Sequence, residues 1–241
     1  MMSKTRITNT LTINAPGKDV VFDGLDFTEN GYIKVTAARS VVVRNCRIYD
    51  LNVESAKKNY WFMVSAQSPV RVEIENCFFG DNVGMNGALY NMIEPHVELN
   101  DGTSVSNNYF NAKSCTHNAI NVYGAVENAV IDLSGNVFEL SSGTIRLGPK
   151  GNVTCAIKMN DNVIKSCDMT IPREYDGLAL LQPYNKETES FEKMTVCMDN
   201  NICPSEQLIY GYSGSSDTML TQEKMPTIVV NGVEIEAPIY H

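Results

Sequence analysis

The clearest chemical potential in this 241-residue sequence lies in the segment Glu94-Pro-His-Val-Glu98. Glu94, His96 and Glu98 alternate along the chain, and alternate residues of a β-strand project from one face. Two carboxylates around an imidazole can hold a metal ion or orient a general acid, which makes these three residues the catalytic candidates. The same pattern is typical of the solvated face of a surface strand, and Pro95 favours a loop or an edge position.

Aromatic side chains form a second group with binding potential. Tyr60 precedes Trp61, the only Trp of the chain. Such rings can stack on sugars, fill a subunit interface or pack in the core. Tyr175 and Tyr184 lie in a long Pro-interrupted segment, and long loops in compact domains are commonly functional. These four residues are the candidates for contact with a partner or a glycan.

The composition excludes several functions. Nineteen basic and 28 acidic residues give a net charge of −9, so nucleic acid and anionic membranes are not expected partners. No apolar run is long enough to span a membrane, and no signal peptide is visible, so we expect synthesis in a host cytoplasm. The seven Cys are an odd number without CxxC spacing. They are expected to be buried free thiols, and no cofactor or metal is predicted.

The strongest pattern is an internal repeat. A six-residue motif has an apolar residue at each end and Asn, Gly or Asp in third place. Its seven copies begin at Phe22, Val43, Ile74, Val105, Leu133, Met159 and Met198. The unequal intervals between the copies are compatible with a solenoid, because extra residues leave it as loops.

The third position of the motif explains its shape. Gly, Asn and Asp tolerate a positive φ angle, so each copy predicts a strand, a sharp corner and a second strand. These corner residues are Gly24, Asn45, Asn76, Asn107, Gly135, Asp161 and Asn200.

The fourth position predicts a ladder of side-chain amides. It is Asn in the last four copies, at Asn108, Asn136, Asn162 and Asn201. Each amide could bond the next coil, although solvated turn residues would give the same sequence.

A further strand is predicted between successive motifs. The candidates are Tyr32–Val35, Phe62–Val64, Val97–Leu99, Ile120–Val122, Ile145–Leu147 and Leu178–Leu180. Three strands per coil and about seven coils predict an all-β fold, a right-handed parallel β-helix. Leucine-rich repeats are the rival solenoid, but they need Leu at fixed spacings and a helical segment, which this sequence lacks.

The corner motif and the Asn stack resemble those of the pectate-lyase-like superfamily of right-handed parallel β-helices, over about residues 8–204. That resemblance implies a scaffold shared by lyases, hydrolases, esterases and phage virion proteins, and the fold does not choose among them. In the enzymes of the superfamily the site follows the first-strand sheet and needs clustered carboxylates. The expected outward residues of that sheet contain a single carboxylate: Lys34, Met63, Glu98, Asn121, Arg146 and Ala179.

The C-terminal part departs from the repeat. Residues 1–204 are expected to form the β-helix, and residues 205–241 a segment that caps or extends it. Residues 227–236 predict a β-hairpin with Asn231-Gly232 in a type I′ turn. The N-terminal end shows no capping helix, so we expect a partner chain, a second copy or residues folded back from elsewhere to cover it.

These observations favour a non-enzymatic structural protein, and the resemblance implies a bacteriophage particle as its setting, with the chain as a capsid decoration, fibre or tail component. Its expected partners are other virion proteins, copies of itself and, as a further candidate, a surface glycan, with a place on the virion surface. The alternatives are a polysaccharide-degrading enzyme, which would need converging carboxylates, and a carbohydrate-binding adhesin module.

Overall fold

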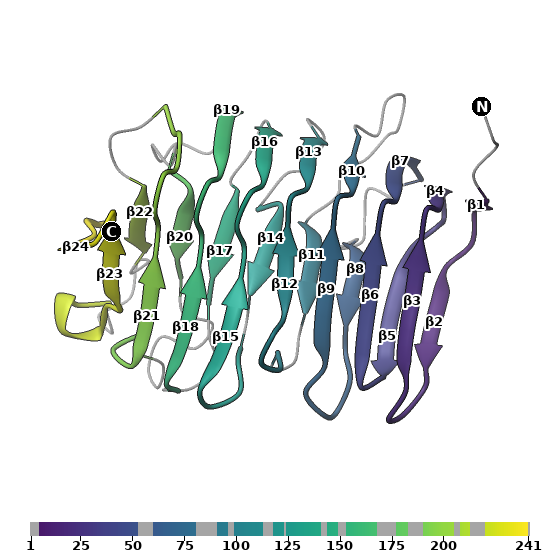
Figure 1. The fold of residues 1–241 in the computed structure, drawn as a ribbon, viewed down its shortest axis with the longest axis horizontal. Helices are drawn as coiled ribbons and strands as arrows, with labels where there is room; N and C mark the ends of the chain where they lie inside the picture. Colours follow the sequence, from purple (N-terminus) through teal and green to yellow (C-terminus); the bar gives the residue numbers. More distant parts are fainter. Residues whose placement is uncertain are drawn as a thin grey trace.

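The computed structural model describes residues 5–52, 60–80, 91–95, 99–112, 118–122, 124–140, 144–148, 153–167, 177–182, 190–204, 208–212 and 220–240. Within these residues the protein is all-β, with three sheets of mostly parallel strands and one short 3-10 helix, η1 (Gln222–Lys224). The strands of each sheet stand side by side along the long axis of the molecule (Figure 1).

Sheet A has the strand order β1 (Arg6–Ile7), β4 (Asp26–Glu29), β7 (Arg47–Leu51), β10 (Phe78–Phe79), β13 (Tyr109–Ala112), β16 (Val137–Leu140), β19 (Val163–Cys167). Sheet B has the order β2 (Leu11–Asn14), β5 (Ile33–Ala37), β8 (Tyr60–Val64), β11 (Asn91–Pro95), β14 (Ile120–Val122), β17 (Ile145–Leu147), β20 (Ala179–Leu181), β22 (Ile209–Tyr212), β25 (Ile239–Tyr240). Sheet C has the order β3 (Asp19–Asp23), β6 (Ser40–Arg44), β9 (Arg71–Glu75), β12 (Ser104–Ser106), β15 (Ala129–Asp132), β18 (Cys155–Lys158), β21 (Met194–Cys197), β23 (Thr227–Val230), β24 (Val233–Ile235).

The chain visits the three sheets in turn, so hydrogen-bonded neighbours are three strands apart in the sequence up to β21. We call three successive strands, one from each sheet, a tier. The first tier is β1–β3 and the seventh is β19–β21. Because each strand pairs only with the tier before and the tier after, the fold is a stack of nearest neighbours.

The predicted corners lie between sheet C and sheet A. All seven third-position residues have a positive φ, from 53° at Asn76 to 71° at Gly135. A left-handed residue turns the chain sharply without adding length. The sheet C strand of one tier and the sheet A strand of the next are therefore held in the same relation in every copy of the motif.

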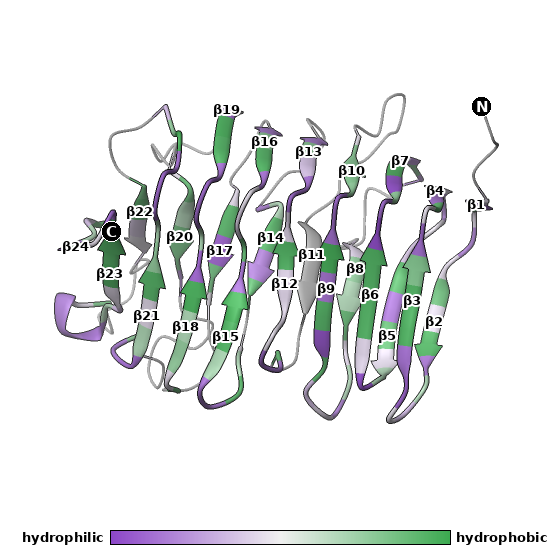
Figure 2. Ribbon diagram, viewed as in Figure 1, coloured by the Kyte–Doolittle hydropathy of each residue, from purple (hydrophilic) through white to green (hydrophobic). Residues whose placement is uncertain are grey.

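The core lies between the sheets and is filled by alternate side chains of each strand. Buried aromatic rings stack along sheet A, where Phe79 and Phe110 have ring centroids 4.5 Å apart and Phe110 and Phe138 5.1 Å apart. Each of these rings is fully buried, which stabilises the fold by about 1.5–3 kcal/mol per ring. Hydrophobic residues follow the strands and hydrophilic residues gather at the turns between them (Figure 2).

Two predicted strands of sheet B needed correction. In the tier where a strand was predicted at Val97–Leu99, sheet B contains β11 instead. Val97 and Glu98 lie outside the described residues, and Leu99 bridges Val70 and Ala125 beside sheet C. The strand predicted at Leu178–Leu180 lies one residue later, at β20. Both errors come from the loops, whose lengths differ between tiers and hide the pairing register.

The C-terminal residues extend the stack. Strand β22 pairs in parallel with β20, and β23 pairs in parallel with β21. Strand β24 then turns back antiparallel to β23 through Asn231 and Gly232, both with positive φ, as a type I′ turn requires. The predicted hairpin is therefore present and adds the last strand of sheet C.

Candidate functional site

The predicted Glu94, His96 and Glu98 group is described only at its first member. Glu94 pairs in register with Met63, and its neighbour Ile93 pairs with Ile120. His96 and Glu98 lie outside the described residues. Because β11 ends at Pro95, Glu94 and not Glu98 takes the carboxylate position in the row of sheet B.

That row continues on both sides of Glu94. In register it contains Lys34, Met63, Glu94, Asn121, Arg146 and Leu180. Leu180 replaces the predicted Ala179 because β20 is shifted by one residue. Asn121 is 1% exposed, and among the described residues neither its amide oxygen nor its amide nitrogen has a hydrogen-bond partner. A buried amide without partners costs about 1–3 kcal/mol.

The four aromatic residues predicted to contact a partner or a glycan do not lie in one common environment. Trp61 is fully buried, with ring centroids 5.4 Å from Phe27 and 5.2 Å from Phe79. It is therefore a core residue and is not accessible to a partner or a glycan. Tyr60 is half-buried at the start of β8. Tyr175 and Tyr184 lie outside the described residues.

The amides of the fourth motif position form a ladder along the stack. The backbone N–H of Asn108 donates to Asn136 Oδ1 (3.0 Å), that of Asn136 to Asn162 Oδ1 (2.9 Å), and that of Asn162 to Asn201 Oδ1 (2.9 Å). Asn108, Asn136 and Asn201 also donate from Nδ2 to backbone carbonyls of an earlier tier. The exception is Asn162, whose buried Nδ2 has no partner within the described residues.

Two Cys take the place of Asn at the N-terminal end of this ladder. The backbone N–H of Leu25 donates to Cys46 Sγ (3.4 Å), and that of Cys77 donates to Asn108 Oδ1 (2.9 Å). Contact with the Cys46 thiol, together with burial, raises the pKa of Cys77. Burial raises the pKa of Cys155, two tiers beyond Asn108, to about 11. The Cys77 and Cys155 thiols stay protonated at neutral pH and pack as small hydrophobic groups.

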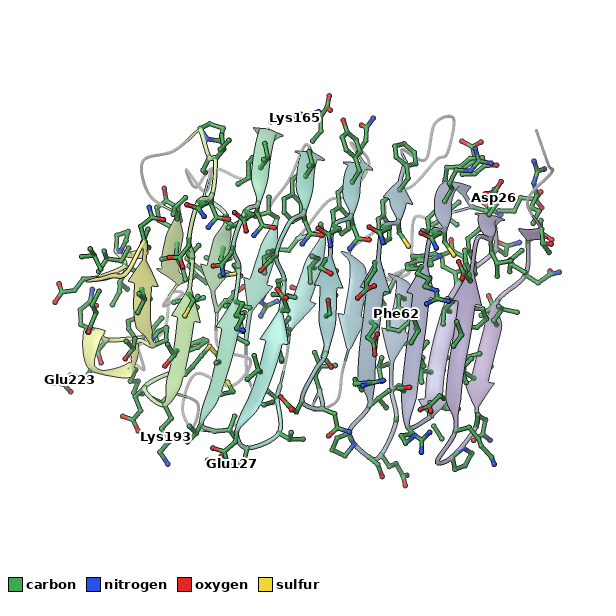
Figure 3. All side chains as sticks on the ribbon, in the orientation of Figure 1. Asp26, Phe62, Glu127, Lys165, Lys193 and Glu223 are labelled. Atoms are coloured by element: carbon green, nitrogen blue, oxygen red, sulfur yellow. The ribbon has the colours of Figure 1, made fainter. Side chains whose placement is uncertain are left out.

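Two ion pairs join the first tier to the second, and a third joins the second tier to the third. Their partners are Asp19 with Arg39, Asp23 with Arg44, and Asp26 with Arg47. Hydrogen bonds from Arg39 and Ser40 hold the pKa of Asp19 well below its usual range. Figure 3 shows Asp26 near the N-terminal end of the stack. The Asp26 side chain is nearly buried while that of Arg47 is half exposed.

A groove of about 440 Å³ follows the corners on the outside of the molecule. We call it the corner groove. One side is formed by the corner residues Asn45, Asn76, Asn107 and Gly135. The other side is formed by the first outward residues of the sheet A strands, Arg47, Phe78, Tyr109 and Val137.

The aromatic side of the corner groove is held in place by its neighbours. The rings of Phe78 and Tyr109 stack with centroids 5.8 Å apart and planes 15° apart. Tyr109 donates its hydroxyl hydrogen to Glu139 (2.6 Å), and Lys165 Nζ lies 4.9 Å from the ring centroid of Tyr109. Figure 3 labels Lys165 at the edge of the molecule beyond sheet A.

The corner groove was not predicted from the sequence. Its aromatic residues occupy the fifth position of the motif, which alternation places outside the core. The signal was available, because that position holds Arg47, Phe78 and Tyr109 in three successive copies. Only the stacking of tiers brings these residues together, since each is about thirty residues from the next along the chain.

None of the protein-family models, curated proteins and solved structures compared with this chain matches it. No helix in the described part of the chain is long and apolar enough to cross a membrane. Within the same residues, no three His, Cys, Asp or Glu side chains are grouped as metal ligands would be.

Proposed function

We propose that this chain is a right-handed parallel β-helix of the pectate-lyase-like kind that serves as a non-enzymatic structural protein and assembles end to end with copies of itself. The three sheets, the positive-φ corners and the amide ladder support the β-helix. The proposed setting, a decoration, fibre or tail component of a bacteriophage particle, rests on the sequence resemblance alone.

The main support for the proposed assembly is where the exposed apolar side chains lie. Six large ones are exposed among the described residues, and four of them lie at the two ends of the stack. Val21 lies on β3, the first strand of sheet C. Ile202 pairs with the last strand of sheet A, and Val233 and Ile235 lie on β24, the last strand of sheet C. Clustered exposed apolar groups are typical of contact surfaces.

The first tier is also less buried than the tiers behind it. Phe22 and Ile13 are only half-buried. Their register partners in the second tier, Val43 and Val35, are completely buried. In addition, among the described strands β1, β2 and β3 each have a neighbour on one side only. Unpaired strand edges beside apolar side chains favour the addition of further strands.

The two ends of the stack are different surfaces, so a contact between them is heterologous and propagates into a filament. The test is sedimentation velocity over a concentration series. We expect the wild type to form larger species as its concentration rises, and Val21→Lys and Val233→Lys each to suppress them. Val130→Lys, on an exposed residue in the middle of sheet C, is the matched control and should assemble like the wild type.

Mixing the two end variants tests the head-to-tail arrangement. Val21→Lys retains an intact C-terminal end and Val233→Lys an intact N-terminal end, so an equimolar mixture should form dimers that neither variant forms alone. A wild type that stays monomeric at every concentration, or assembly that both substitutions leave unchanged, would contradict the proposal.

One observation favours the alternative of a polysaccharide-degrading enzyme. Glu94, Asn121 and Arg146 occupy neighbouring register positions on sheet B, and the buried amide of Asn121 has no partner in the part of the chain that the structure describes. Release of reducing ends or unsaturated products from a panel of polysaccharides, abolished by Glu94→Gln, would favour this alternative over the structural role.

A further inference from the structure

The corner groove has the composition of a ligand site and is separate from both ends of the stack. It runs across four tiers, from Arg47 to Val137. Neighbouring strands are roughly 4.8 Å apart, so the groove extends about 14 Å along the molecule. Its two sides differ in chemistry, because one carries side-chain amides and the other carries aromatic rings.

The amide side offers unused hydrogen-bonding groups. Asn76 and Asn107 are exposed at successive corners, with φ angles of 53° and 56°. Among the described residues, neither side chain has a hydrogen-bond partner, although both backbone N–H groups donate to the next tier. Each amide therefore presents two donor hydrogens and an acceptor oxygen to solvent. Their spacing is set by the stack, so the two amides need no rearrangement to bind one ligand together.

The aromatic side offers an apolar surface that is already fixed. Phe78 is 39% exposed and lies against Tyr109. The hydroxyl of Tyr109 is bonded to Glu139, and the Tyr109 ring lies under Lys165. Gly80 leaves room for the Phe78 ring, because a Cβ atom there would lie 2.9 Å from Phe78 Cε1. Rings that are held in place lose little conformational entropy on binding.

The charges and backbone groups of the groove restrict its ligand. The guanidinium of Arg47 is bonded to the carboxylate of Asp26, so its charge is largely neutralised. With a net charge of −9, the chain as a whole disfavours polyanions. The backbone N–H groups of the Asn76 and Asn107 corners are already bonded, so an extended peptide finds no strand edge to join there.

We infer that the corner groove binds a neutral glycan chain lying along the stack. Sugar hydroxyls match the donors and acceptors of the Asn76 and Asn107 amides. The apolar C–H face of a pyranose ring matches the exposed surface of Phe78. The spacing of the tiers, roughly 4.8 Å, is close to the length of one pyranose unit, so successive sugars meet successive tiers.

The test is native affinity electrophoresis in gels that contain a neutral polysaccharide, with β-glucan, galactomannan and dextran as the panel and polygalacturonate as the acidic comparison. We expect at least one neutral polysaccharide to retard the wild-type chain. Phe78→Ala, and the double substitution Asn76→Gly with Asn107→Gly, should each weaken the apparent affinity by about tenfold. Glycine keeps the positive φ of both corners, so these variants remove the amides and preserve the turns.

Asn200→Gly is the matched control. Asn200 is also an exposed corner residue with a φ of 56°, but it lies outside the groove. This variant should migrate like the wild type in every gel, and circular dichroism should show the same fold for all variants. Absence of retardation across the neutral panel would overturn the inference. So would binding that the groove variants leave unchanged, or retardation by polygalacturonate alone.

Discussion

The side chain of Asn136 contributes more to this fold than its size suggests. It is completely buried, its Oδ1 accepts from the backbone of Asn108, and its Nδ2 donates to the carbonyls of Val105 and Leu133. One amide therefore makes hydrogen bonds to the backbone at three separate positions, Asn108, Val105 and Leu133. A ladder of this kind links tiers by satisfying buried backbone groups.

Asn136→Ala should lower the free energy of unfolding by about 2–4 kcal/mol, because it leaves buried backbone groups without partners. Urea denaturation followed by circular dichroism measures the change. Asn201→Ala is the control, since Asn201 is half-buried at the end of the ladder and should cost clearly less. Equal losses at the two positions would argue against the ladder as a source of stability.

The corner position makes a second prediction. Asp161 has a φ of 56° and an exposed side chain. Asp161→Val should destabilise the protein by about 1–2 kcal/mol, because a β-branched residue is strained at positive φ. Asp161→Gly should unfold near the wild-type temperature in a thermal melt. If both substitutions had the same effect, the side chain and not the backbone angle would be responsible.

At the scale of the elements, the stacked rings of sheet A hold adjacent tiers together. Phe110 lies between Phe79 and Phe138 and is fully buried. Phe110→Ala should cost about 3–5 kcal/mol, because the tiers cannot close the cavity that it leaves. Phe110→Leu keeps most of the apolar volume and should cost less. Chemical denaturation of the two variants would separate loss of volume from loss of ring stacking.

The stability contributed by the ion pair between Asp19 and Arg39 should depend on pH. Because Arg39 and Ser40 lower the pKa of Asp19 in the folded protein, the pair stabilises the fold fully above the unfolded carboxyl pKa of about 3.9. That contribution is lost as the pH falls toward the lower pKa of the folded state. The difference in melting temperature between wild type and Asp19→Asn should therefore be constant near neutral pH and shrink below about pH 4. A difference that grows in acid would contradict this assignment.

From β1 to β21 the described strands form a stack in which each strand pairs with the tiers beside it. Such stacks lose structure from their ends, because the end tiers have a neighbour on one side only. In a native-state hydrogen-exchange experiment at low protein concentration, amides of β2 and β3 should exchange faster than amides of β15 and β18. Uniform protection along the stack would show that the protein opens only as a single unit.

The same experiment at high concentration connects stability to the proposed assembly. If a second copy covers the first tier, the amides of β2 and β3 should become protected as the protein concentration rises, and Val21→Lys should prevent that protection. Amides in the middle of the stack should not respond to concentration.

The local features of this protein were readable from the sequence alone. The corner residues could be predicted because positive φ is a property of single residue types, and the alternating strands beside them because side-chain period is fixed by the backbone. All seven corners have the predicted angle. The Asn ladder was predictable for the same reason, since equal positions in successive motifs stack.

The tertiary structure decided what depends on the register between tiers. Loops of unequal length gave no sign that β11 ends at Pro95, which moved the row position from Glu98 to Glu94. From the sequence, Trp61 could lie on the surface or in the core. The structure places it in the core, packed against Phe27 and Phe79. The corner groove exists only because residues about thirty positions apart lie in neighbouring tiers. Sequence fixes the conformation of each short segment, but packing between distant segments determines which side chains meet.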